Sequence, residues 1–170
     1  REPLSRYFSA YYDRKRSKEL NKIERSYYEL FPTANKLAEA LSHKDNEIKF
    51  KAIEAMEKIE LVNHKLEYWF SIDFLKKQKP YFIFEQEKLE EDFIKFCRLI
   101  KLNKKINFYV RNKNLDKPES NNLSHLAISN LKKYLKNDFQ IYNYLTNNKK
   151  NINPNNWFNL YLLKLFLQRL

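Results

Sequence analysis

The sequence contains no glycine among its 170 residues, and it has only one cysteine, Cys97. Glycine-rich loops hold the phosphates of dinucleotides and of nucleoside triphosphates, because only glycine lets the backbone come that close. Neither kind of loop can therefore lie within these residues. A single cysteine excludes an internal disulfide and any zinc site built from several cysteines. We expect Cys97 to be an inert thiol in the core.

Long apolar runs are also missing, and none approaches the ~20 residues that a membrane-spanning helix needs. Nothing at the start resembles a signal peptide. Because the chain begins at Arg1 rather than at a methionine, we expect it to be a fragment or a processed piece. With a formal net charge of +12 and 43% hydrophobic residues, it should fold and present a positive surface. Such a surface favours nucleotides, sulfated glycans, nucleic acids or acidic lipids.

Apolar residues recur mostly at three- and four-residue spacing, which predicts helices. We expect the first helix to run from Pro3 to about Leu20 or beyond. Later helices should begin after a Thr33 cap, near Asn46, and after a cap at Asn121 or Asn122. The one predicted strand is at residues 81–84, where aromatic and β-branched residues follow a proline.

Residues 1–12 have the pattern of a chain that leaves a loop and enters a helix. Pro3 suits the first helical turn, and Glu2 complements the positive end of the helix dipole. Arg1 then lies just before the helix and Ser9 about two turns inside it. A guanidinium offers a planar fork that binds phosphate bidentately, and a serine hydroxyl adds a further hydrogen bond. An ordinary amphipathic helix start would also contain an exposed Arg and a Ser facing water.

The longer string Arg-Glu-Pro-Leu-x-Arg-x-x-Ser-Ala-Tyr resembles the 3′-phosphate-binding segment of sulfotransferases, closest to their glycan-directed branch. These enzymes transfer a sulfuryl group from 3′-phosphoadenosine 5′-phosphosulfate (PAPS) to a hydroxyl. The resemblance implies that Arg1 and Ser9 bind the 3′-phosphate of PAPS, that the acceptor is a carbohydrate, and that no metal is needed. On this interpretation a nucleotide and a glycan are expected as partners in preference to nucleic acid.

Three later phrases resemble the same family in the same order. Residues 64–69 are similar to a phrase on the acceptor side of the cleft, so His64 either touches the acceptor or, as we prefer, is a hydrogen-bonded structural residue. Residues 87–93 are similar to the helix start that follows the last core strand. We assign Glu87 and Asp92 to structure, because acidic residues favour a helix N-terminus. Residues 138–142 are similar to the closing element.

The resemblance implies an α/β fold of the three-layer, P-loop type, of which this chain is the mainly helical C-terminal part with one or two strands. Residues 1–145 would complete the sulfotransferase domain. Residues 146–156 read as a linker, and residues 157–170 as an apolar helix that packs on the core, binds a partner or lies on a membrane surface. Arg111 and Lys113, in a basic loop, are further candidates for phosphate or sulfate contacts.

Parts of the chemistry are missing from these residues. In the family, the 5′-phosphosulfate loop with its catalytic lysine, and the general base, precede the segment that resembles residues 1–12. The alternative functions are a basic helical module that binds nucleic acid, and a helical domain that binds a partner protein. A bias toward Lys, Asn and Ile favours the cytoplasm of an AT-rich bacterium. A eukaryotic relative would act in the Golgi lumen.

Overall fold

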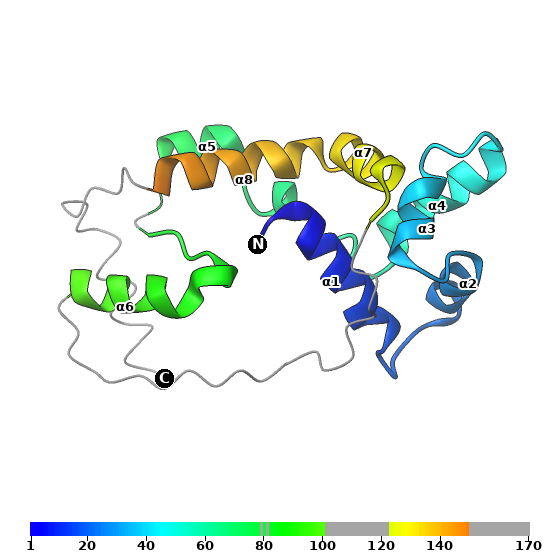
Figure 1. Ribbon diagram of the computed structural model, residues 1–170, viewed down its shortest axis with the longest axis horizontal. Helices are drawn as coiled ribbons and strands as arrows, with labels where there is room; N and C mark the ends of the chain where they lie inside the picture. The colour runs from blue at the N-terminus through cyan, green and yellow to red at the C-terminus, as the bar shows by residue number, and fades with distance from the viewer. Residues whose placement is uncertain (79, 81, 101–122, 150–170) are drawn as a thin grey trace. The chain divides into compact units, whose positions relative to one another are not determined.

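The computed structural model describes residues 1–78, 80, 82–100 and 123–149 (Figure 1). Within these residues all regular structure is helical, with eight α-helices and two short 3-10 helices, and there is no strand. The expectation of a mainly helical chain is therefore confirmed. Two compact units are present, residues 1–70 with 114–142 and residues 71–113 with 143–170. We call them unit 1 and unit 2.

Unit 1 contains four helices from the first part of the chain and two from the later part. The bounds of its elements are α1 Pro3–Lys15, α2 Lys22–Leu30, α3 Ala34–Ala40, α4 Asn46–Lys58, η1 Leu66–Tyr68 and α7 His125–Tyr134, together with the first half of α8 Lys136–Asn148. Helix α3 packs against α1, α4 and α7, and α2 packs against α4 (Figure 1). The segments that precede residue 70 and follow residue 122 are thus joined through α3 and α7.

Side chains from just outside the helices cap their first turns. Thr33 accepts a hydrogen bond from the N–H of Lys36 at 3.1 Å, so its predicted role as a cap is confirmed. The predicted start of α4 at Asn46 is also confirmed, with Asp45 as the cap. Ser124 caps α7, whereas Asn121 and Asn122 lie outside the described residues. Short polar side chains at these positions satisfy backbone donors that a helix leaves open.

The prediction of one opening helix to about Leu20 is wrong, because α1 ends at Lys15. Asn21 and Glu24 form a capping box, in which each side chain accepts a hydrogen bond from the other residue's backbone N–H. This reciprocal pair favours the start of a second helix at Lys22. The turn between α1 and α2 lets the two helices pack around shared tyrosines rather than continue as one rod.

The core of unit 1 consists of small and aromatic residues. Alanines from several helices are buried in it, and the hydroxyls of Tyr7 and Tyr28 donate hydrogen bonds to backbone carbonyls. Its fully buried members include Tyr7, Tyr11, Ala34, Leu37, Ala38, Ala52, Ala55, Met56, Ile59, Ala127 and Leu131. Because small residues allow helices to approach closely, the short helix α3 can contact three neighbours.

Unit 2 has fewer described elements: α5 Ile72–Lys77, η2 Gln86–Lys88, α6 Leu89–Leu99 and the end of α8. The predicted strand is wrong for residues 82–84, and Tyr81 lies outside the described residues. The rings of Phe82 and Phe84 instead pack against Phe96 of α6, with centroids 5.3 and 5.4 Å apart. A strand needs a neighbouring strand for its backbone hydrogen bonds, and the described residues provide none.

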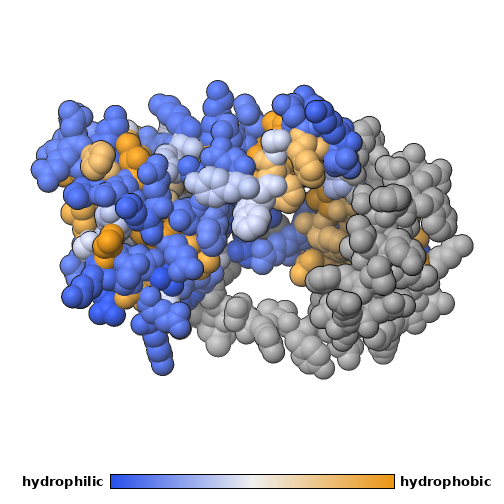
Figure 2. All heavy atoms as spheres, turned by 180° about the vertical axis from the view of Figure 1, so that it is seen from behind, coloured by the Kyte–Doolittle hydropathy of each residue, from blue (hydrophilic) through white to orange (hydrophobic). Residues whose placement is uncertain are grey.

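Most of the described surface visible in Figure 2 is hydrophilic, with hydrophobic patches between the polar residues. Exposed aromatic residues include Tyr68 and Trp69 in unit 1 and Phe74 in unit 2. Residues 146–148, which the sequence places in a linker, form the end of α8. The predicted apolar helix at residues 157–170 and the candidates Arg111 and Lys113 lie outside the described residues.

Candidate functional site

The start of α1 has the local geometry that the sequence predicts. Pro3 is the first helical residue, and Glu2 caps the helix by accepting a hydrogen bond from the N–H of Ser5 at 2.9 Å. Arg1 therefore lies immediately before the cap, and it is exposed. The positive end of the helix dipole and the basic side chain are both favourable to an anion at this position.

Ser9 lies on the half-exposed side of α1, one turn after Ser5 and one turn before Asp13. Its hydroxyl donates a hydrogen bond to Asp13 Oδ2 at 3.1 Å. The seven-residue interval between Glu2 and Ser9 corresponds to about 10 Å along the helix axis. An anion held by both Arg1 and Ser9 would thus require the Arg1 side chain to lie along the helix toward Ser9.

The opposite face of α1 is anchored by two buried tyrosines. The hydroxyl of Tyr7 donates to the carbonyl of Ala34 at 2.8 Å, and that of Tyr11 donates to the carbonyl of Phe31. Burial raises the pKa of Tyr7 well above its ordinary value, and nearby Tyr11 acts in the same direction. Both hydroxyls therefore stay protonated and act as structural donors that set the rotation of α1.

Arg6 connects α1 to two distant segments of unit 1. Its Nη2 lies 3.1 Å from Asp138 Oδ2 of α8, and its Nη1 donates to the backbone carbonyl of His64. The other oxygen of Asp138 accepts the backbone N–H of Glu67 at 3.3 Å. Burial lowers the pKa of Arg6, an effect that Asp138 opposes. We call these four residues the Arg6 network.

The Arg6 network involves only the backbone of His64, so the structural interpretation of its side chain stays a prediction. Its backbone carbonyl is a structural acceptor, whereas the residue as a whole is exposed. The neighbouring Lys65 places its Nζ 4.5 Å from the centre of the Tyr134 ring, and this cation–π contact fixes the loop onto α7. The segment before η1 is thus held by backbone and lysine contacts.

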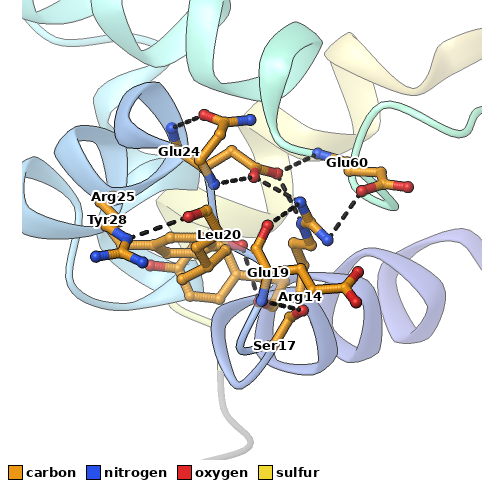
Figure 3. Close-up of polar contacts among 10 residues, drawn as sticks. Arg14, Ser17, Glu19, Leu20, Glu24, Arg25, Tyr28 and Glu60 are labelled. Atoms are coloured by element: carbon orange, nitrogen blue, oxygen red, sulfur yellow. Dashed lines mark hydrogen bonds and ion pairs between the residues drawn. The ribbon is translucent and has the colours of Figure 1, made fainter.

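A second buried ion pair joins α1 to α2 (Figure 3). Arg14 donates from Nε and Nη2 to the two carboxylate oxygens of Glu24, at 2.7 and 2.6 Å. Its Nη1 lies 2.9 Å from Glu60, and the N–H of Glu60 donates to Glu24 at 3.1 Å. The hydrogen bonds from Arg14 lower the pKa of Glu24, and backbone N–H groups act in the same direction. These contacts join α1, α2 and the loop at Glu60 to one another.

The loop beside Glu60 shows one consequence of having no glycine. Leu61 has a φ of 66°, in the left-handed region that glycine occupies most easily. The adjacent hydrogen bond from Glu60 N–H to Glu24 holds this turn in place. A tertiary hydrogen bond thus stabilises a backbone conformation that a glycine would adopt without steric strain.

In unit 2, Asp92 lies in the first turn of α6, where the sequence assigns it to structure, and its side chain is also buried. It accepts the N–H of Glu85 at 3.0 Å and the ammonium group of Lys149 at 2.6 Å. Burial acts to raise the pKa of Asp92, but these hydrogen bonds lower it overall. Glu87 lies in η2. The carboxylate of Asp92 is thus engaged by the protein's own donors.

The sequence did not indicate that Arg6 and Arg14 pair with the buried carboxylates of Asp138 and Glu24. Charged residues are usually exposed, so their types indicate nothing about burial. A signal was present in the motif, because Arg6 belongs to the string that resembles the sulfotransferase segment. Among the described residues no group of three or more His, Cys, Asp or Glu side chains could hold a metal ion.

No model of a known protein family, no curated protein and no solved structure matches this chain. Within the part of the chain that the structure describes, no helix combines the length and the apolar character required to cross a membrane.

Proposed function

We propose that this chain supplies the 3′-phosphate-binding part of a PAPS-dependent sulfotransferase that acts on a carbohydrate hydroxyl. The complete enzyme would have the three-layer α/β fold of that family, with the described helices as its C-terminal part. Arg1 and Ser9 would bind the 3′-phosphate. The 5′-phosphosulfate loop and the general base are not assigned to any of these residues.

The observation that supports this proposal is the Arg6 network. Arg6 comes from the first resembling phrase, His64 and Glu67 from the second, and Asp138 from the closing phrase. Arg6 and Asp138 are 132 positions apart in the sequence. The network thus brings three of the four resembling phrases together within unit 1, as the parts of one domain would be. The phrase at residues 87–93 lies in unit 2 and contributes no residue to it.

The chemistry at α1 is consistent with the proposed role. A guanidinium and a hydroxyl can give a phosphate two or three charge-assisted hydrogen bonds. Tyr7 and Tyr11 fix the rotation of α1, so Ser9 stays on the side away from the core. Positive charge also attracts an anionic nucleotide at longer range. Such preorganised contacts position the donor for sulfuryl transfer.

The test compares two nucleotides that differ only by the 3′-phosphate. Adenosine 3′,5′-bisphosphate should bind more tightly than adenosine 5′-phosphate, as measured by isothermal titration calorimetry. Arg1→Ala should weaken the binding of the bisphosphate at least about fivefold, equivalent to ~1 kcal/mol, and Ser9→Ala should do so less strongly. Neither substitution should change the binding of adenosine 5′-phosphate, since it lacks the group that they contact.

Arg25→Ala on α2 is the matched control, because it removes the same charge from an exposed position. If Arg1→Ala and Arg25→Ala have the same effect, only net charge matters and the proposal fails. Steeply salt-dependent binding to DNA or RNA, with no preference between the two nucleotides, would instead support a nucleic-acid-binding module.

A further inference from the structure

The Ser9 hydroxyl has a partner on its own helix. It donates to Asp13 Oδ2 at 3.1 Å, and the other oxygen of Asp13 lies 2.7 Å from Arg16 Nη2. Ser9 and Asp13 lie one turn apart on α1 and Arg16 is its C-cap residue, and the side chains of Asp13 and Arg16 are 45% and 43% exposed. This part of α1 is therefore accessible to a ligand that approaches from solvent.

A serine hydroxyl has a single hydrogen to donate. While that hydrogen is directed at Asp13, it cannot be directed at a phosphate, whose ionised oxygens only accept. Binding of a 3′-phosphate at Ser9 would exchange one acceptor for another: the O–H···O contact to the carboxylate breaks, the O–H···O contact to the phosphate forms, and no proton is transferred. The carboxylate would remain near the bound phosphate, and two like charges at that distance repel.

We infer that Asp13 is a specificity-determining residue of the proposed nucleotide site, because its carboxylate competes with the 3′-phosphate for the Ser9 hydroxyl. This inference rests on the proposed function. Arg16 moderates the competition by pairing with the carboxylate. Asp13 therefore weakens the binding of nucleotides that carry a 3′-phosphate, the donor and the spent adenosine 3′,5′-bisphosphate alike, and leaves nucleotides without this group unaffected.

The experiment measures a gain of affinity, which a misfolded variant would not produce. Asp13→Asn and Asp13→Ala should each tighten the binding of adenosine 3′,5′-bisphosphate by about three- to tenfold in calorimetry at low salt. Binding of adenosine 5′-phosphate should stay the same. Asparagine can still accept the Ser9 hydrogen and alanine cannot. The gain in Asp13→Asn therefore measures the loss of like-charge repulsion, and a larger gain in Asp13→Ala measures the release of the Ser9 hydroxyl from competition. Arg16→Gln should weaken binding of the bisphosphate.

Glu47→Gln is the matched control, since it makes the same change in net charge in the exposed first turn of α4, which packs on α2 and α3. It should leave both affinities unchanged. The inference is overturned if the Asp13 variants leave the affinity for adenosine 3′,5′-bisphosphate unchanged, or if they raise the affinity for both nucleotides equally. In either case a loss of affinity in Arg1→Ala and Ser9→Ala would leave the proposed function standing. If those two variants also have no effect, both proposals fail.

Discussion

Each of the two units buries a carboxylate against a basic side chain that is distant in sequence, but the surroundings differ. In unit 1, Asp138 pairs with Arg6 beside an extensive core of tyrosine, alanine and leucine. In the described part of unit 2, Asp92 pairs with Lys149, and the buried apolar residues are Leu75, Phe96 and Cys97. Among the described residues, the ion pair of unit 2 therefore lies beside fewer buried apolar side chains than that of unit 1.

The two bases also bind their carboxylates differently. The planar guanidinium of Arg6 reaches two acceptors at once, Asp138 and the carbonyl of His64, and so fixes their relative orientation. The ammonium group of Lys149 is a point charge between Asp92 and Glu85. Its pKa is raised by these carboxylates in spite of its burial. Arginine thus specifies geometry in unit 1, whereas lysine mainly neutralises charge in unit 2.

The largest effect should come from Asp138→Ala in unit 1. The substitution leaves Arg6 buried without its counter-ion and the Glu67 N–H without its acceptor. We expect the free energy of unfolding to fall by about 3–5 kcal/mol, measured by urea denaturation. The double variant Arg6→Met/Asp138→Leu should be much more stable than Asp138→Ala, because it has no unpaired buried charge. A loss below ~1 kcal/mol in Asp138→Ala would show that the core alone carries unit 1.

A smaller and local effect is expected from Lys149→Met in unit 2. Asp92 would keep the N–H of Glu85 but lose the ammonium group, and the side chain of Lys149 is already 21% exposed. We expect about 2 kcal/mol of local destabilisation, which corresponds to roughly 30-fold faster hydrogen exchange in α6. Exchange in α3 should not change. Equally accelerated exchange in α3 would show that the two units unfold together, and would contradict the view that each is stabilised by its own ion pair.

The smallest effect should be that of Glu24→Gln, and it should depend on pH. Arg14 lowers the pKa of Glu24 in the folded state, so the pair stabilises the fold fully above the ordinary glutamate pKa. That stability is lost as the pH falls through the lowered folded-state pKa. We expect Glu24→Gln to cost about 1–2 kcal/mol at pH 7, and the difference from the native protein to shrink below about pH 4. A constant difference across this range would contradict the assignment.

Local signals predicted much of the helical structure. The Thr33 cap and the helix start at Asn46 are confirmed. The errors have non-local causes. The aromatic residues at 82–84 have the composition of a strand, but their rings pack against helix α6 instead. The turn after Lys15 follows from the Asn21–Glu24 capping box and from the tyrosine core that α1 and α2 share.

The candidate site divides in the same way. The helix start at Pro3 with its Glu2 cap was predictable, because a cap involves residues three positions apart. The contact between Ser9 and Asp13 is also local. It depends on the rotamers of both side chains, which the sequence does not specify. The Arg6 network was not predictable from residue types, since a charged residue indicates exposure unless its partner is known.

The sequence by itself determined where most helices begin, which of their faces are apolar and which residues lie at the start of α1. These features depend on neighbours within one or two helical turns. Only the tertiary structure decided that Arg6 meets Asp138, that Arg14 meets Glu24, and that Leu61 adopts a positive φ in a chain without glycine. A buried charge or a residue with positive φ is stable only when distant parts of the chain supply a counter-ion or a hydrogen bond. The local spacing of residues does not indicate which distant parts these are.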